Sequence, residues 1–199
     1  MFTGIVEAKS KVLNVQSGEQ SFKLTLARPP HFDDLHRGDS IACNGVCLTL
    51  ENFDNQTLQF TVGFETINVT AWNLEKLLDL EFNLERSLKF GDRIHGHLVS
   101  GHVDALAEVV HREWVGECLI FNFSLPHALR KEIWKKSSVA INGVSLTVNE
   151  VDKDTFSVCL IPETLHQTQL ETVIVGDKVN IETDYYMKGL LSAQGVKYE

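Results

Sequence analysis

The chain has 199 residues and a formal net charge of −9, with 43% hydrophobic and 23% charged residues. These are ordinary globular values, and the length suits one large domain or two of roughly 100 residues. No basic cluster is present, which argues against partners such as nucleic acid or an anionic membrane. The sequence contains no run of about 18 apolar residues, so no membrane span is expected. Four cysteines without CxxC spacing favour free thiols in a cytoplasmic protein.

Short apolar segments separated by turn residues dominate the chain. The dipeptides Asn44-Gly45 and Asn142-Gly143 each predict a tight hairpin, since both turn positions need a positive φ. In chain order we expect strands at residues 22–26, 40–43, 46–50, 58–62, 93–98, 119–123, 156–160 and 178–182. Many short strands at this spacing favour closed antiparallel barrels or sandwiches.

Helical signals are few. Residues 126–133 fit a short helix that starts near a proline, and residues 69–78 could hold one or two turns. Residues 185–194 place Tyr186, Leu190 and Leu191 at helical spacing before Gly195. Such an amphipathic tail must bury its apolar face, either against its own barrel or, as we favour, against a neighbouring subunit.

Residues 40–66 and 138–164 repeat each other. Eleven of these 27 aligned positions are identical at an offset of 98 residues, and residues 3–8 match residues 100–105 at an offset of 97. Repetition at half the chain length predicts one structural unit used twice. Two similar units imply two similar pockets, suited to two similar ligands or to two copies of one molecule.

The two copies carry small hydroxyl or thiol groups at matched positions, which pair Cys47 with Ser145, Thr49 with Thr147 and Thr66 with Thr164. Residues i and i+2 of a strand share a face, so the members of each strand's pair point together. Thr also favours strands, and Cys is often a small buried hydrophobe, so a structural role stays open. Recurrence in both copies favours a pocket for a planar heterocycle or a polyol.

Histidine is concentrated in residues 95–102 (HGHLVSGH). On a strand, His95 and His97 would share a face and could bind a metal ion, but no third ligand of matching character stands out, so no metal site is expected. His102 suits general acid–base chemistry or ligand contact. A plain surface position is more plausible for His95 than for His97 or His102.

The second copy carries ionisable groups where the first has none: His102 aligns with Ile5, Lys136 with Gly38 and Asp184 with Ser87. Random drift of surface charge is one explanation. The other is an enzyme that handles two like molecules in unlike roles, one as donor and one as acceptor, with charged groups where protons move.

Several long motifs occur in a characteristic order: MFTGIVE, NGVCLTL, GHLVSGHVDA, NGVSLTV, IPETL and VNIETD. On these the chain resembles the riboflavin synthase (alpha-chain) family over nearly its whole length. The resemblance implies an all-β fold of two tandem, similar six-stranded antiparallel Greek-key barrels plus a C-terminal helix. The implied divisions are an N-terminal barrel (1–97), a C-terminal barrel (98–184) and a helix for oligomerisation (185–199).

The resemblance also implies a transferase of riboflavin biosynthesis. Two molecules of 6,7-dimethyl-8-ribityllumazine would exchange a four-carbon unit and yield riboflavin and 5-amino-6-ribitylamino-uracil, without metal or cofactor. Partners implied are a homotrimer, with each site between the N-terminal barrel of one subunit and the C-terminal barrel of its neighbour, and a possible association with lumazine synthase.

Carried over residue by residue, the resemblance implies two sets of site residues. The catalytic candidates are Ser40, Cys47, His102, Lys136 and Asp184. His102 and Asp184 are expected to manage protons, and Cys47 or Ser40 to assist addition at C7. The substrate-binding candidates are Phe2, Thr3, Gly4, Ile5, Val6, Cys47, Leu48, Thr49, Thr61, Val62, Gly63, Phe64, Glu65, Thr66, His97, Gly101, His102, Val103, Lys136, Ser145, Leu146, Thr147, Cys159, Leu160, Ile161, Pro162, Glu163 and Thr164.

The chain departs from the family pattern at His95, where glycine is usual, and at Ser137 and Asn142, where glycine and aspartate are usual. Asn suits the turn equally well, and no catalytic loss is expected. The main rival is a non-catalytic lumazine protein that binds a lumazine or flavin as an optical antenna. A barrel module that binds nothing and a metalloenzyme built on the histidines are weaker rivals.

Overall fold

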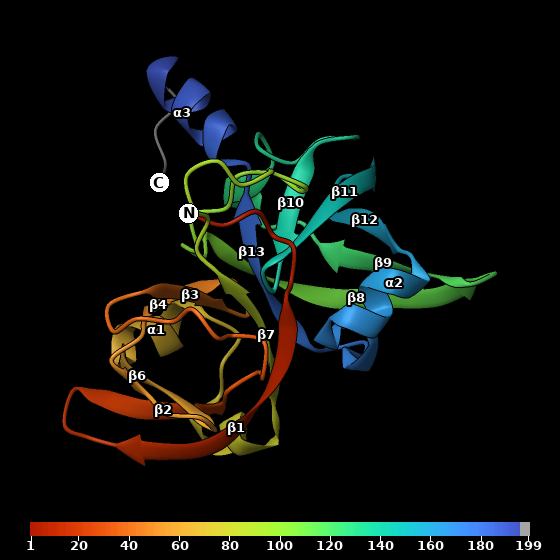
Figure 1. Cartoon of the computed structure of the whole chain (residues 1–199). Helices are drawn as coiled ribbons and strands as arrows, with labels where there is room; N and C mark the ends of the chain where they lie inside the picture. Colours follow the sequence, from red (N-terminus) through yellow and green to blue (C-terminus); the bar gives the residue numbers. More distant parts are fainter. Residues whose placement is uncertain (196–199) are drawn as a thin grey trace.

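A computed structural model describes residues 1–195, which form two β-structures and a projecting C-terminal helix (Figure 1). The first repeat lies at the lower left of the figure and the second at the right, and the two meet near strands β7 and β13. Helix α3 (Tyr185–Ala193) extends from the top, away from both repeats. The expected all-β class with one terminal helix is confirmed.

The first repeat is an antiparallel sheet in the order β4-β3-β7-β1-β2-β6-β5. Strand β7 returns between β1 and β3, which is a Greek-key connection. Its elements are β1 (Ala8–Ser17), β2 (Ser21–Ala27), β3 (Ser40–Cys43), β4 (Val46–Thr49), β5 (Asn52–Phe53), β6 (Thr57–Gly63), α1 (Phe64–Val69), the 3-10 helix η1 (Leu74–Asp79) and β7 (Glu81–Arg86).

The second repeat is a closed barrel in the order β10-β11-β12-β9-β8-β13. Its elements are β8 (Ala105–Val115), β9 (Cys118–Ser124), η2 (His127–Leu129), β10 (Ser138–Ile141), β11 (Val144–Val151), β12 (Thr155–Leu160), α2 (Pro162–Gln167), η3 (Gln169–Thr172) and β13 (Lys178–Thr183).

The two repeats have the same circular strand order and differ at one place. Strand β11 runs continuously, with a bulge between Val148 and Glu150. In the first repeat the equivalent strand is broken into β4 and β5, of which β4 pairs with β3 and β5 with β6. One barrel is therefore closed, and the other has the same strand order with an interruption at Leu50 and Glu51.

Each repeat buries its own core. Strand β2 alternates buried and less buried residues, as a strand with one face in a core should. Phenylalanines fill both interiors, with Phe22, Phe60 and Phe82 in the first and Phe121, Phe123 and Phe156 in the second. The burial pattern of β9 is identical to that of β2 in its buried positions, so the sequence repeat is also a repeat of packing.

The repeats meet across a pseudo-twofold axis at their Asn-Gly turns. Asn44 and Asn142 both have φ of 46°, and the glycines that follow are also at positive φ, which confirms both predicted hairpins. A Cβ on Gly45 would lie 2.7 Å from the Gly143 nitrogen, and the reverse distance is also 2.7 Å. Only glycine permits this approach of two backbones.

Two buried asparagines tie the repeats together in the same symmetric way. Asn83 Nδ2 donates to the Asn142 carbonyl at 3.0 Å, and Asn180 Nδ2 donates to the Asn44 carbonyl at 2.9 Å. Each bond starts in one repeat and ends in the other. The two units therefore associate through reciprocal contacts, as the subunits of a symmetric dimer do.

Two expectations about elements are corrected. Residues 93–98 are not a strand, and the isolated bridge that follows them joins Val99 to Phe2. The helix expected at 126–133 is a short 3-10 turn, η2. Residues 69–78 hold the one or two helical turns expected, because Val69 ends α1 and Leu74 begins the 3-10 helix η1, which continues to Asp79. The expected tail helix is confirmed, and residues 196–199 of the predicted oligomerisation element lie outside the described residues.

Candidate functional site

The first residues of each repeat lie against the other repeat. The first segment, residues 2–6, pairs with the second segment, residues 99–103, through two hydrogen bonds between Phe2 and Val99. The Gly4 carbonyl then accepts from the Ser145 nitrogen of β11 at 2.7 Å. The first segment therefore lies beside the strand of the second repeat that carries the candidate residues Ser145 and Thr147.

The second segment makes the matching contact with the first repeat, so the two repeats exchange their first segments. The Gly101 carbonyl accepts from the Cys47 nitrogen of β4 at 2.8 Å. Both glycines have positive φ, and a Cβ on Gly101 would lie 2.5 Å from the Cys47 Cβ. A side chain at this position would collide with the strand, so glycine is required for the segment to lie so close.

Two buried glutamates hold the segments in place. Glu85 of β7 accepts hydrogen bonds from the nitrogens of Thr3 and Gly4 and from the Thr3 hydroxyl, at 2.6 to 2.9 Å. Burial raises the pKa of Glu85 to about 7, against the lowering effect of these donors. Glu182 of β13 binds residues 100 and 101 in the same way, and burial also raises its pKa.

The matched polar residues share a face, as predicted. Cys47 is half-buried and Thr49 exposed, while Leu48 between them is buried in the core. Strand β11 shows the same pattern, with Ser145 and Thr147 outward and Leu146 inward. Ser40 is the cross-strand partner of Thr49, which places it on the face that carries Cys47.

The other predicted contact residues divide between surface and core. Thr61 and Gly63 on β6 are exposed, and Cys159 and Ile161 at the equivalent places are half-buried and exposed. Helices α1 and α2 follow directly and carry the remaining candidates, Phe64, Glu65, Thr66, Pro162, Glu163 and Thr164. The side chains of Phe2, Leu48, Val62, Leu146 and Leu160 are buried, so they could shape a pocket but not present a side-chain face to it.

The structure locates the ionisable residues that the second repeat carries and the first lacks. Ile5 and His102 occupy equivalent exposed positions on the two segments. Lys136 has φ of 72°, in the region where Gly38 of the first repeat has φ of 95°. A lysine thus adopts a conformation that normally favours glycine, at a cost of about 1 to 3 kcal/mol. Asp184 caps helix α3 by accepting from the Tyr186 and Met187 nitrogens.

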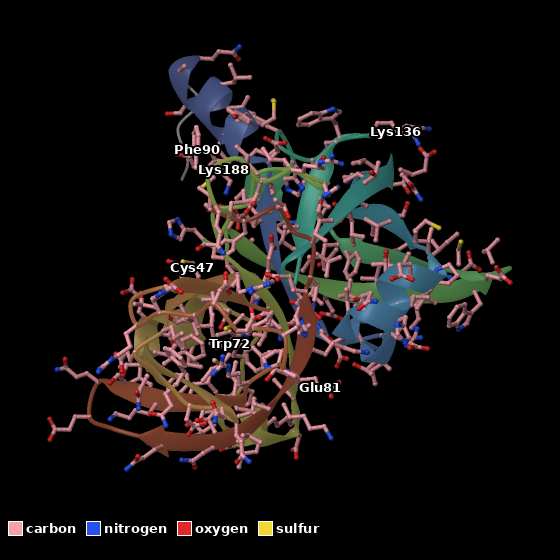
Figure 2. All side chains as sticks on the ribbon, in the orientation of Figure 1. Cys47, Trp72, Glu81, Phe90, Lys136 and Lys188 are labelled. Atoms are coloured by element: carbon pink, nitrogen blue, oxygen red, sulfur yellow. The ribbon has the colours of Figure 1, made fainter. Side chains whose placement is uncertain are left out.

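Cys47 and Lys136 are not brought together within one chain. Figure 2 shows Cys47 on the side of the first repeat and Lys136 at the far rim of the second. These two candidate residues therefore face separate regions of one chain. A cavity of about 440 Å³ opens beside the first segment and is lined by Thr3, Ile5 and Arg86 among others.

The sequence analysis did not predict the roles of Glu85 and Glu182 in holding the segments, nor the contact of His97 with Ser145. His97 Nδ1 lies 2.7 Å from the Ser145 hydroxyl, and the imidazole is buried while His95 is exposed. The glutamates had a signal, because Glu85 and Glu182 match at the 97-residue offset on strands that correspond in the two repeats. Within residues 1–195, no three His, Cys, Asp or Glu side chains are arranged to hold a metal ion. No helix of the described chain is long and apolar enough to cross a membrane.

Comparison with known proteins identifies the repeat. The lumazine binding domain matches residues 3–87 and again residues 100–184. Riboflavin synthase of Schizosaccharomyces pombe is 40% identical over 92% of this chain and 89% of that protein. Riboflavin synthase of Chlamydia pneumoniae is 39% identical over 94% of this chain and 92% of its own length, and that of Bacillus subtilis is 35% identical over 92% and 85%.

Solved structures agree on the fold. LumP complexed with riboflavin superposes with a TM-score of 0.81 at 23% identity, covering 92% of this chain and 99% of LumP. LumP complexed with 6,7-dimethyl-8-(1'-D-ribityl) lumazine gives a TM-score of 0.79 at 22% identity over the same shares. The chain belongs to the riboflavin synthase family and carries the lumazine binding domain twice.

Proposed function

We propose that this protein is a riboflavin synthase, which converts two molecules of 6,7-dimethyl-8-ribityllumazine into riboflavin and 5-amino-6-ribitylamino-uracil by transfer of a four-carbon unit. The observation that carries the proposal is 35–40% identity to riboflavin synthases over more than nine-tenths of the chain. The duplicated pocket supplies the chemical reason, since a reaction between two copies of one molecule needs two like binding places.

The chemistry divides between the two ligands. The donor must lose a proton from its C7 methyl group, and the acceptor must be attacked at C7 by a nucleophile. We assign proton handling to His102 and Asp184, and assistance of the addition to Cys47 or Ser40, which lie on one face. Lys136 would bring positive charge to the second pocket. Stacking the two rings in the reactive orientation would supply much of the rate, without cofactor or metal.

The remaining candidates would bind substrate. The exposed residues of β4, β6, β11 and β12, with both segments and the starts of α1 and α2, would surround the ring and the ribityl chain in each pocket. The hydroxyls of Thr49, Thr66, Thr147 and Thr164 suit the polyol, because each offers a donor and an acceptor. The proposed domain limits remain 1–97, 98–184 and 185–199.

The assembly we propose is a homotrimer in which the N-terminal pocket of one subunit faces the C-terminal pocket of its neighbour. The separation of Cys47 and Lys136 in Figure 2 supports this, because two ligands in one chain would not meet. Helix α3 supports it too: Tyr185, Tyr186 and Leu190 are 50%, 66% and 57% exposed on an element that projects from the barrels. Association of this trimer with lumazine synthase is a further part of the proposal. Four free thiols support a cytoplasmic location.

Turnover separates this function from that of an antenna protein. The LumP structures are only 22–23% identical to this chain, so they support the fold alone. We expect purified protein to consume two lumazines for each riboflavin formed, measured by chromatography. The substitution His102→Gln should slow this strongly, whereas the same substitution at another exposed histidine, His111→Gln on β8, should not. Tight lumazine binding without any riboflavin would refute the enzyme and support the antenna.

A further inference from the structure

His97 and Ser145 form a buried pair behind the second-repeat pocket. His97 is 8% exposed, and its Nδ1 lies 2.7 Å from Ser145 Oγ. The His97 nitrogen also donates to the Thr3 carbonyl at 3.1 Å. A Cβ on the neighbouring Gly96 would lie 2.8 Å from Ser145 Oγ, so the backbone closes over the hydroxyl. The histidine therefore has little freedom to leave the serine.

The surroundings of the other ring nitrogen decide the direction of this hydrogen bond. His97 Nε2 is buried and has no hydrogen-bond partner within residues 1–195. A buried N–H without an acceptor costs about 1 to 3 kcal/mol, and orphaned N–H groups are rarer in proteins than unused lone pairs. Burial lowers the pKa of His97, against the opposing effect of Asp184, which favours the neutral ring. The proton therefore belongs on Nδ1, which donates to Ser145 Oγ.

This direction leaves the hydrogen of the Ser145 hydroxyl available. Ser145 Oγ accepts from His97, and no hydrogen bond of the described chain uses its own O–H. Ser145 is half-buried on the outward face of β11, beside exposed Thr147. At the equivalent place in the first repeat, the Cys47 thiol makes no side-chain hydrogen bond within residues 1–195 and is a weak donor by nature.

We propose that His97 is a positioning residue that commits the Ser145 hydroxyl to donate a hydrogen bond to the ligand in the second-repeat pocket. The inference rests on the proposed function and adds to it the direction of the hydrogen bond between Ser145 and the ligand. The ligand atom facing Ser145 must be an acceptor, such as a ring carbonyl or ring nitrogen of the lumazine. The same atom in the first pocket faces a thiol, so two identical molecules are held differently.

Two nearly isosteric variants test the proposal. Asparagine can place its amide N–H where His97 Nδ1 stands, while leucine of similar shape cannot. We expect His97→Leu to lower kcat/KM for riboflavin formation roughly ten-fold, the factor for one hydrogen bond, and His97→Asn to stay within about three-fold of wild type. Because the asparagine amide could also turn its oxygen toward Ser145, His97→Asp fixes the direction: its carboxylate can only accept, so this variant should lose at least as much activity as His97→Leu, and activity near wild type would overturn the proposal. Equal losses in His97→Leu and His97→Asn would also overturn it.

A double-mutant cycle checks that His97 acts through Ser145. Ser145→Ala alone should match His97→Leu, and the pair together should be no worse than Ser145→Ala. Multiplied losses would assign His97 a separate, structural role. Melting temperatures exclude misfolding, and if His97→Leu does not fold, the comparison of His97→Asn with the acceptor-only His97→Asp still decides whether His97 donates to Ser145.

Binding separates this inference from the proposed function. Should wild type form no riboflavin, the proposed function fails, but fluorescence titration with the lumazine still measures the pocket. His97→Leu and Ser145→Ala should then weaken the same binding step roughly ten-fold, and His97→Asn should leave it unchanged. A binding step that is insensitive to all three variants would contradict the role of His97.

Discussion

Glu85 and Glu182 give a prediction that crosses the two repeats. Glu85 belongs to the first repeat, yet it holds Thr3 and Gly4, and Gly4 is bonded to Ser145 of the second repeat. Glu182 belongs to the second repeat and holds the segment that is bonded to Cys47. We therefore predict that each glutamate supports the ligand pocket of the opposite repeat.

The substitution Glu85→Gln keeps the shape and removes the charge. One amide oxygen can still accept from Thr3, but the Gln NH₂ would meet the Gly4 N–H, so a donor faces a donor. Hydrogen bonds to charged groups contribute about 1.5 to 3 kcal/mol, and a buried unpaired donor costs a similar amount. A loss of about 3 kcal/mol from the attachment of the first segment corresponds to roughly a hundred-fold weaker pocket if the segment must be bound for the ligand to bind.

Titration with a ribityllumazine that lacks the C7 methyl group measures the two pockets without turnover. Ser145→Ala and Cys47→Ala identify which binding step belongs to which pocket. We expect Glu85→Gln to weaken the step that responds to Ser145→Ala, and Glu182→Gln the step that responds to Cys47→Ala. If each glutamate instead weakened the pocket of its own repeat, the exchange of segments would not govern binding.

Three further changes test other parts of the structure. Burial raises the pKa of Glu85 from 4.5 to about 7, so the folded protein binds the Glu85 proton more tightly than the unfolded chain does. The free energy of unfolding should therefore fall by about 3 kcal/mol as the pH rises from 4.5 to 7. Urea denaturation measures this fall, which should be smaller in Glu85→Gln. Lys136→Gly should release backbone strain and raise stability by about 1 kcal/mol while weakening the second pocket; lower stability would show that φ of 72° is not strained there. Gly45→Ala should cost more than about 3 kcal/mol because its Cβ meets Gly143, whereas Gly116→Ala, also at positive φ but with open space around it, should cost only about 1 kcal/mol; similar melting temperatures for the two would contradict tight contact between the repeats.

The strands were predictable where alternation and turn chemistry agree. Asn44-Gly45 and Asn142-Gly143 predicted two hairpins, and the sequence repeat indicated that the two halves share the same strands. Residues 93–98 failed because the alternation of HGHL resembles a strand, while the backbone there finds only scattered partners, such as the Thr3 carbonyl for His97. Helices α1 and α2 have six residues each, too few for helical periodicity to be visible, although Pro162 marks the start of α2.

The candidate site was predictable as residue types but not as a three-dimensional arrangement. Cys47, Thr49, Ser145 and Thr147 share faces because a strand has a period of two. The exchange of segments has no such signal, since it depends on glycine carbonyls that meet strands about 50 to 140 residues away. The partner of His97 was equally hidden, because a contact between a linker and a distant strand leaves no periodic trace in the sequence.

The number of lumazine-type ligands bound per chain tests the central claim most directly. The measurement is equilibrium dialysis of the analogue without the C7 methyl group against purified protein of known concentration. With a pocket built in each lumazine binding domain, we predict saturation at two ligands per chain. Saturation at one ligand per chain would contradict a second working pocket, and with it the use of the duplicated domain to bring two like molecules together.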